Sequence, residues 1–349
     1  MKRLERPADG GDRRKTRNRS LKLGEIYRPV GETLHPPISY EIFPPKSGNY
    51  DNLIEELRTL KEFNPAANAI SSPAPAANAL CEDPALYGSS PCLQAGAISS
   101  PAPALISITY GAGGGNRSST LELAKRIQSE LELNLMQHFT CVCSTRGFIE
   151  NYLKEIESLG VKNILALKGD LPKDFTDAPD ALAAQDFAYA NELVEFIASN
   201  SSLEIAVAGY PEKHPAALTL EDDIANLKRK IDAGGSAIFT QLFFENDNFY
   251  KYCELLVAKG IQKPVIAGIL PVSNFSQLSK MASMCGVILP VKMVARFEKF
   301  KDNEADTIKA GIEFATQQCQ KLTEFGVSGL HFYTLNRAEP TRTIIQNLS

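Results

Sequence analysis

The chain has 349 residues, of which 44% are hydrophobic and 22% charged, and its formal net charge is −4. This composition is typical of a globular protein with a large core, and so small a net charge gives no overall attraction for nucleic acid. No apolar run reaches the roughly 18–20 residues of a membrane span, and the seven cysteines, without a CxxC pair or zinc-type spacing, indicate free thiols in a reducing cytoplasm.

The first 30 residues differ in composition from the rest of the chain. Five basic residues fall within residues 13–19, and apolar residues are few. This pattern predicts a disordered basic leader over residues 1–30. A mitochondrial transit peptide is the alternative, but acidic residues interrupt the segment, and the absence of an apolar h-region argues against secretion.

Eight short β-rich runs follow, each succeeded by a helical pattern. Several runs are almost wholly apolar, as expected of strands covered on both faces. The strands are expected at residues 38–43, 105–110, 135–141, 163–169, 204–210, 237–244, 264–270 and 329–335. The helices are expected at residues 51–63, 119–133, 148–159, 186–198, 220–233, 248–259, 274–284 and 303–325.

Eight βα units predict an α/β fold of the (β/α)8 TIM-barrel type over residues 31–349. A doubly wound open sheet is the alternative, but it would normally carry a glycine fingerprint in its first βα turn, and residues 41–45 carry none. One segment interrupts the pattern, because residues 66–104 are rich in Ala, Pro and Ser and the octapeptide AISSPAPA occurs at 69–76 and 97–104. We interpret it as a low-complexity insertion in a surface loop on the N-terminal face of the barrel, with a partner-binding arm as the alternative.

Polar residues gather where the expected strands end, which is where a barrel of this kind builds its active site. The first strand delivers Glu41 just before a Pro-Pro pair, and a buried carboxyl there needs a partner or a raised pKa. His331 in the eighth strand is interpreted as structural. The set suits a planar polar heterocycle and a cofactor that supplies the chemistry, whereas Lys168 at a strand end leaves a Schiff-base aldolase open.

Eight segments, read together, resemble the methylenetetrahydrofolate reductase family. They are ISYEIFPPK, SITYGAGGGNRS, HFTC, ALKGDLP, AGYPEKHPAA, LKRKIDAGGSAIFTQLFF, GILPVSNF and HFYTLNRAE, and they span Ile38 to Glu339 in the family's order. The resemblance, to the bacterial form with a catalytic domain alone, implies an FAD-binding (β/α)8 barrel. It also implies ping-pong reduction of 5,10-methylenetetrahydrofolate to 5-methyltetrahydrofolate by NADH or NADPH for methionine synthesis, in a cytoplasmic homo-oligomer.

The resemblance also implies roles for individual residues. Glu41 would be the general acid that opens the methylene bridge, and Asp170 would lie beside the flavin and tune its potential. The implied FAD contacts are Tyr110, Ala112, His138, Lys168, Gly169, Asp170, Ala190, Tyr210, His214, Ala217, Asp223, Asn226, Arg229 and Lys230. Thr109 and Gln241 would contact the nicotinamide nucleotide. The implied folate contacts are Asp170, Gln241, Gln277, Tyr333 and Arg337.

Three features depart from the family pattern. Lys168 stands where arginine is common, so its contact with the cofactor would be a point charge. Met281 stands where some members have an aromatic residue, which changes how substrate would stack. The insertion at 66–104 is foreign to the family, and with it an inactive flavin-binding remnant stays an alternative to the enzyme.

Overall fold

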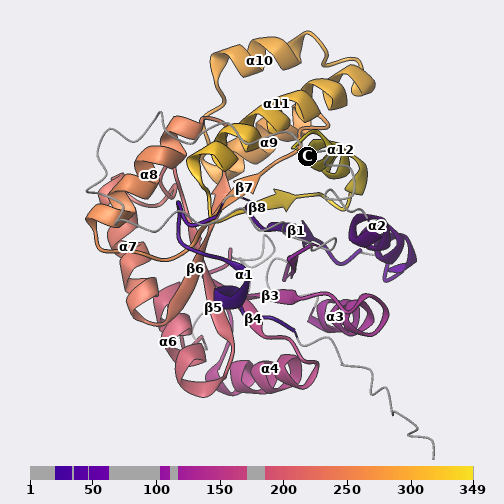
Figure 1. Cartoon of the computed structure of the whole chain (residues 1–349). Coiled ribbons are helices and arrows are strands. Elements are labelled where there is room, and N and C mark those ends of the chain that lie inside the picture. Colours follow the sequence, from indigo (N-terminus) through magenta and orange to yellow (C-terminus); the bar gives the residue numbers. More distant parts are fainter. Residues whose placement is uncertain are drawn as a thin grey trace, which may run out of the picture.

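The computed structural model of the chain describes residues 20–33, 35–45, 47–62, 103–110, 117–170 and 185–348. Eight parallel strands close into a barrel in sequence order, with helices around it (Figure 1), as the βα pattern predicts. The strands are β1 (Ile38–Ile42), β2 (Leu105–Ile108), β3 (Leu135–Thr140), β4 (Asn163–Leu167), β5 (Glu204–Gly209), β6 (Gly235–Leu242), β7 (Val265–Ile269) and β8 (Gly329–Tyr333).

The strands read as apolar runs because both of their faces are covered. All residues of β2, β3 and β7 are buried. Side chains that point outward join the helices in one large core, whereas a smaller core that includes Leu105, Met136 and Phe239 fills the lower barrel. Successive residues of a strand alternate between these two environments, so each strand places every second side chain in the barrel interior.

The helices of the outer layer confirm the predicted order. They are α2 (Asp51–Glu62), α3 (Arg117–Leu131), α4 (Arg146–Ser158), α6 (Ala190–Asn200), α7 (Leu220–Asp232), α8 (Asn246–Ala258), α9 (Phe275–Cys285), α10 (Val291–Glu298), α11 (Glu304–Phe325) and α12 (Ala338–Leu348). The predicted start of α6 at residue 186 is wrong. The Glu192 carboxylate accepts hydrogen bonds from the backbone N–H groups of Ala188 and Tyr189, and this capping interaction sets the start at Ala190.

Residues 20–30, which the sequence assigned to a leader, belong to the fold. A short helix α1 (Leu23–Ile26) lies across the N-terminal end of the barrel, and Leu23 and Tyr27 are buried in the lower barrel core. The side chain of Asn163 at the start of β4 accepts from the N–H of Leu23, and Glu204 at the start of β5 accepts from that of Gly24. The rest of the leader expected over residues 1–30, namely residues 1–19, lies outside the described residues.

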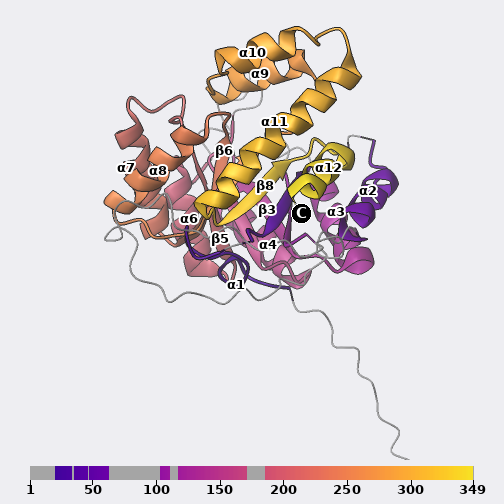
Figure 2. The same ribbon diagram turned by 45° about the horizontal axis from the view of Figure 1, so that its top comes forward.

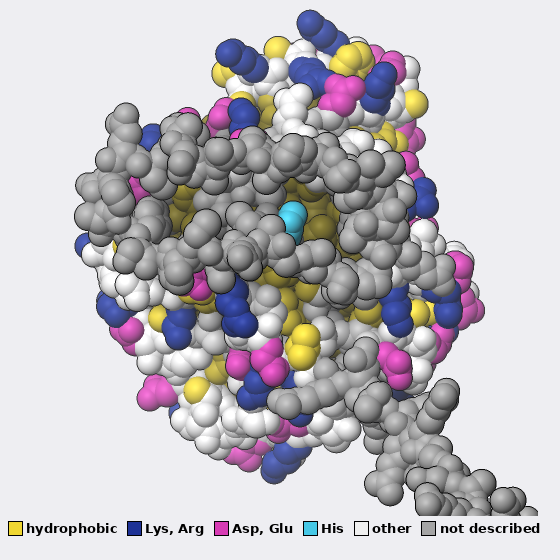
Figure 3. Space-filling view, in the orientation of Figure 1, with side chains coloured by type: hydrophobic (Ala, Val, Ile, Leu, Met, Phe, Trp, Pro, Cys, Tyr) yellow, Lys and Arg dark blue, Asp and Glu magenta, His cyan; other side chains and the backbone are white. Residues whose placement is uncertain are grey.

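The sequence analysis did not predict α10 or α12. Helices α9 and α10 and the adjoining end of α11 form a layer that projects from one side of the barrel (Figure 2). A third core holds this layer together and includes Leu278, Met293, Phe297 and Ala310. Lys and Arg side chains gather on its outer surface (Figure 3). Lys292 of α10 is exposed.

The insertion predicted at 66–104 and the glycine run at 111–115 lie, apart from Pro103 and Ala104, outside the described residues. The backbone N–H of Ala104 donates to the carbonyl of Ile38, so the chain re-enters the described fold beside the start of β1. No helix within the described ranges is long and apolar enough to span a membrane.

Candidate active site

Glu41 is the last residue but one of β1, and its side chain lies inside the barrel near the C-terminal rim. Its register partners on the two neighbouring strands are Ser107 and Tyr333, so these side chains point into the same space. Residue Glu41 is only 9% exposed, and burial raises the pKa of its carboxyl from the usual 4.5 to about 8. This carboxyl therefore holds its proton at neutral pH.

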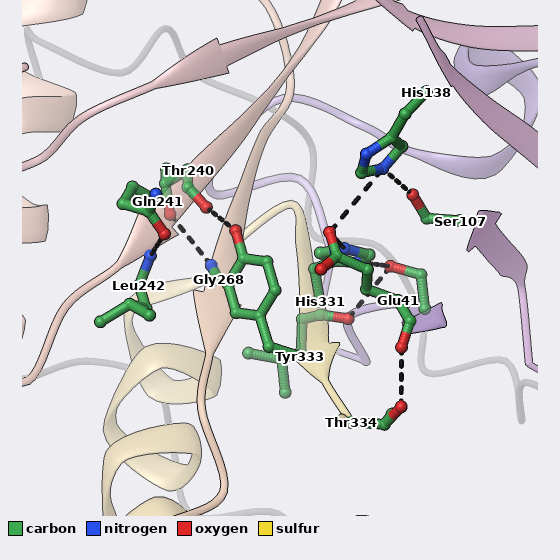
Figure 4. A network of polar contacts seen from close by, with 12 residues as sticks. Glu41, Ser107, His138, Thr240, Gln241, Leu242, Gly268, His331, Tyr333 and Thr334 are labelled. Atoms are coloured by element: carbon green, nitrogen blue, oxygen red, sulfur yellow. Dashed lines mark hydrogen bonds and ion pairs between the residues drawn. The ribbon is translucent and has the colours of Figure 1, made fainter. Parts of the chain in front are cut away.

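Two buried imidazoles lie close to the Glu41 carboxyl (Figure 4). Its Oε2 atom is 3.7 Å from Nε2 of His138 and 4.0 Å from Nε2 of His331. Burial lowers the pKa of both histidines to about 3, so both are neutral and neither supplies a positive charge that would ionise the acid.

Serine hydroxyls hold these two imidazoles in place. His138 Nε2 is hydrogen-bonded to Ser107, and His331 Nδ1 lies 2.9 Å from Oγ of Ser39. The sequence analysis interpreted His331 as structural and did not single out either serine. The strand period gives a signal for Ser39 alone, since Ser39 and Glu41 are two residues apart on one face of β1, whereas the pairing of Ser39 with His331 comes from the β1–β8 register.

A cavity of about 580 Å³ opens next to the ends of β4 and β5. It is lined by five predicted residues, Lys168, Gly169, Asp170, Tyr210 and His214, and also by Cys141, Val142, Leu167, Gln185, Phe187, Ala188 and Tyr189. The ammonium of Lys168 lies 5.4 Å from the centre of the exposed Tyr189 ring, a residue that the sequence analysis missed.

Gly169 shapes the floor of this cavity. Its φ of +83° is a left-handed conformation, and a Cβ atom at this position would lie 2.7 Å from Cβ of Thr140. Only glycine meets both conditions. The chain can then turn sharply between Lys168 and Asp170, and both side chains reach the cavity.

The loop between β5 and α7 forms a second wall. The rings of Tyr210 and His214 meet edge to face with centroids 4.7 Å apart, and Oδ2 of Asp223 accepts from the backbone N–H of His214 at 3.1 Å. Lys230 turns inward, where its ammonium donates to the carbonyl of Ala208 at 2.6 Å. Burial lowers the Lys230 pKa to about 8, although the nearby Asp223 carboxylate opposes this shift.

The chain also matches a known protein family. The family described as methylenetetrahydrofolate reductase matches residues 94–349, which is most of the chain. The chain belongs to the methylenetetrahydrofolate reductase family.

Relatives from bacteria and plants carry the same family name. The 5,10-methylenetetrahydrofolate reductases of Salmonella typhimurium and Escherichia coli are 38% and 36% identical over 252 residues, which is 72% of this chain and 82% of each relative. Methylenetetrahydrofolate reductase (NADH) 1 of Arabidopsis thaliana is 32% identical over 342 residues. The alignment covers 94% of this chain but only 51% of the plant protein, so the chain spans about half its length.

Some residues implied by the methylenetetrahydrofolate reductase resemblance lie at the barrel rim. The hydroxyl of Tyr333 donates to the carbonyl of Thr240 at 2.7 Å, and burial and the neighbouring Glu41 raise its pKa well above 10. Gln241 lies on the same strand as Thr240, and its Oε1 atom accepts a hydrogen bond from the N–H of Leu242 (Figure 4). The N–H of Thr109 pairs with the carbonyl of Ile42 at the end of β1.

Other members of that set lie away from the rim interior. The Tyr110 ring packs in the core between the strands and α4, against Phe139 and Tyr152. Asn226 and Arg229 bond to each other on the exposed face of α7, and Ala217 accepts from Lys213. Four more members complete the account: Gln277 and Arg337 are exposed, Ala190 is the first residue of α6, and Ala112 lies outside the described residues.

The residues present fit an aromatic cofactor with an anionic tail. The cavity offers ring faces from Tyr189 and Tyr210 and an apolar wall that includes Leu167. The ammonium of Lys168 stands at its edge and that of Lys230 is buried behind its second wall, where an anion would offset the desolvation that lowers the Lys230 pKa. Glu41 does not line this cavity but lies at the same rim of the barrel, and its uncharged carboxyl can donate a proton to a substrate placed over the rim.

Proposed function

We propose that the protein reduces 5,10-methylenetetrahydrofolate to 5-methyltetrahydrofolate, with FAD as its cofactor and NADH or NADPH as the electron donor. Family membership supports the substrate and product. The single observation in the structure that carries the proposal is the buried Glu41, whose pKa burial raises to about 8, at the same barrel rim as a cavity lined by aromatic side chains and Lys168. The product would feed methionine synthesis.

Glu41 is the general acid of this reaction. Opening the methylene bridge breaks a carbon–nitrogen bond, and the departing nitrogen needs a proton if the carbon is to become an electrophilic iminium ion. The overall reaction consumes one hydride and one proton. A carboxyl with a pKa of about 8 still carries that proton at neutral pH, which an ordinary carboxyl does not.

FAD, when bound, would accept a hydride from the nicotinamide nucleotide and deliver it to the folate, so that the two substrates use one site in turn. Lys168, Tyr210, His214 and Lys230 would hold this cofactor. Burial raises the Tyr210 pKa and lowers the His214 pKa, and the charge of the nearby Asp170 adds to the first shift and opposes the second. Asp170 would also contact the pterin. The negative charge of Asp170 would disfavour additional negative charge on the reduced flavin.

Substrate contacts follow from the rim. Thr109 and Gln241 would contact the nicotinamide nucleotide, and Gln241 and Tyr333 would then meet the folate in its turn. Gln277 at the start of α9 would extend this surface. Arg337 would bind the carboxylates of the folate tail, because a guanidinium suits carboxylate geometry.

The first test is the visible spectrum of the purified protein under anaerobic conditions. A flavin spectrum that bleaches with NADH or NADPH and returns with methylenetetrahydrofolate is expected. A colourless protein that cannot be reconstituted with FAD would contradict the proposal. Borohydride trapping of a carbonyl substrate on Lys168 would instead identify a Schiff-base enzyme.

The assignment of Glu41 has its own test. Glu41→Gln should still be reduced by the nicotinamide nucleotide but should lose reoxidation by folate, because an amide cannot donate the proton of a carboxylic acid. Glu204→Gln is the matched control, since Glu204 is also an acidic residue on a barrel strand but lies at the opposite end of the barrel. Normal rates for both half-reactions in Glu41→Gln would show that another group is the acid.

A further inference from the structure

The loop between β8 and α12 has an unusual backbone. Leu335 and Asn336 are consecutive and both left-handed, with φ angles of 51° and 61°. Asparagine adopts this conformation more readily than other residues with a side chain, whereas for a bulky residue such as leucine it is rare. Strain of this kind persists only where surrounding contacts enforce it.

Two side chains of this loop hold the end of β1. The Asn336 amide makes a two-point contact with Phe43, because its Oδ1 atom accepts from the Phe43 N–H and its Nδ2 atom donates to the Phe43 carbonyl, each at 2.8 Å. The Thr334 hydroxyl donates to the carbonyl of Glu41 at 2.7 Å (Figure 4). The β1–β8 register ends at the pair Glu41 and Tyr333, so Asn336 continues that pairing beyond the last strand residue.

The end of β1 depends on this loop because the chain beyond it offers little pairing. Pro44 and Pro45 have no N–H to donate. On the opposite side, β1 is held at its end by the N–H of Thr109, which bonds to the carbonyl of Ile42. The side chain of Asn336 therefore supplies the contact that fixes Phe43 from the β8 side.

We propose that Asn336 is a positioning residue that fixes the strand end carrying Glu41 and so aims its carboxyl at the substrate. The inference rests on the proposed function. Because Arg337 follows directly, the same contact also fixes the spacing between the acid and the cation expected to hold the folate tail. Small misplacements of a reacting group reduce rates steeply, by about 100-fold for 1 Å.

The test uses the flavin-bound full-length protein and the variant Asn336→Gly. Glycine tolerates the left-handed backbone and removes only the amide, so the fold should survive. Reoxidation of the flavin by methylenetetrahydrofolate should slow by about 10- to 100-fold, whereas reduction by the nicotinamide nucleotide should stay within about twofold. Asn336→Asp should lie between, because a carboxylate still accepts from the Phe43 N–H but cannot donate to its carbonyl.

The matched control is Asn134→Ala. Asn134 makes the same kind of two-point contact at the other end of the barrel, accepting from the N–H of Leu21 at 2.8 Å and donating to the carbonyl of Ala104 at 2.9 Å. Its loss should lower the melting temperature without separating the two half-reactions. If Asn336→Gly behaves like this control, or slows both half-reactions equally, its role is structural and the proposal fails.

A second measurement does not depend on turnover. The Glu41 carboxyl can be titrated by ¹³C NMR in the protein without cofactor, in the parent and in Asn336→Gly. Loosening the strand end should admit water and move the Glu41 pKa from about 8 towards its ordinary value. An unchanged titration together with unchanged rates would overturn the inference. A parent protein that fails to reduce folate would refute the proposed function alone, since this titration still reports the placement of Glu41.

Discussion

Burial of Glu41 predicts that Glu41→Gln changes how stability depends on pH. The folded chain keeps a proton on Glu41 up to about pH 8, whereas the unfolded chain releases it near the usual pKa of 4.5. Because the folded state then binds more protons, the free energy of unfolding of the parent falls as pH rises through this window. Each pH unit is worth about 1.4 kcal/mol per proton, so the full window amounts to up to about 5 kcal/mol.

Glutamine has nearly the same shape and does not titrate, so the variant lacks this loss. The difference in unfolding free energy, variant minus parent, should rise between pH 5 and pH 8 and level off above it. Urea titrations of both cofactor-free proteins at several pH values measure this difference. The buried His138 and His331 are present in both proteins, so their titration largely cancels. A difference that stays flat with pH would show that Glu41 is ionised or well solvated in the fold, and the argument for a proton-holding acid would fail.

Three further predictions concern the fold and the cofactor wall. Gly311→Ala should lower the free energy of unfolding by more than about 2 kcal/mol, because the added Cβ would collide with the carbonyl of Val272. Gly147→Ala is the control and should raise the free energy of unfolding by up to about 1 kcal/mol, because the space around Gly147 is open. Equal effects of the two changes in urea titrations would refute this reasoning. Leu23→Ala should lower the free energy of unfolding by about 2–5 kcal/mol, since this side chain is fully buried under the barrel, and a loss below about 1 kcal/mol would show that α1 is not part of the core. Lys230→Met should stabilise the cofactor-free protein at neutral pH while weakening FAD binding at least tenfold by fluorescence titration, and unchanged binding would remove Lys230 from the cofactor site.

Most of the fold could be predicted from the sequence because barrel strands are covered on both faces. Such strands appear as short apolar runs, and all eight runs are strands, though each ends one or two residues earlier than predicted. Helix α10, which was missed, begins after Pro290 without a side-chain cap. Helix α12 begins at Ala338, whose N–H is capped by the Glu56 carboxylate from α2, 282 residues earlier in the chain. Helix α1 has only four residues and owes its place to buried contacts rather than to a pattern.

The candidate site was predictable to a different degree. The rule that strand ends build the site, together with the family resemblance, named Glu41 and five residues that line the cavity, and their roles stay predictions. The group around the Glu41 carboxyl was less accessible, because Ser39 and His331 become neighbours only through the β1–β8 register. The contact that Asn336 makes was similarly hidden, since the backbone of Phe43 lies 293 residues away in the sequence.

Strands β1 and β8 close the barrel, and their pairing has a consequence for how the protein is made. Strand β1 leaves the ribosome early, yet its partner β8 is synthesised roughly 290 residues later. At about 5–20 residues per second, this delay lasts roughly 15–60 s. During that time the outer edge of β1 has no partner strand, and unpaired strand edges of this kind are prone to aggregate. Translation speed and chaperone supply should therefore influence the yield of this protein in cells.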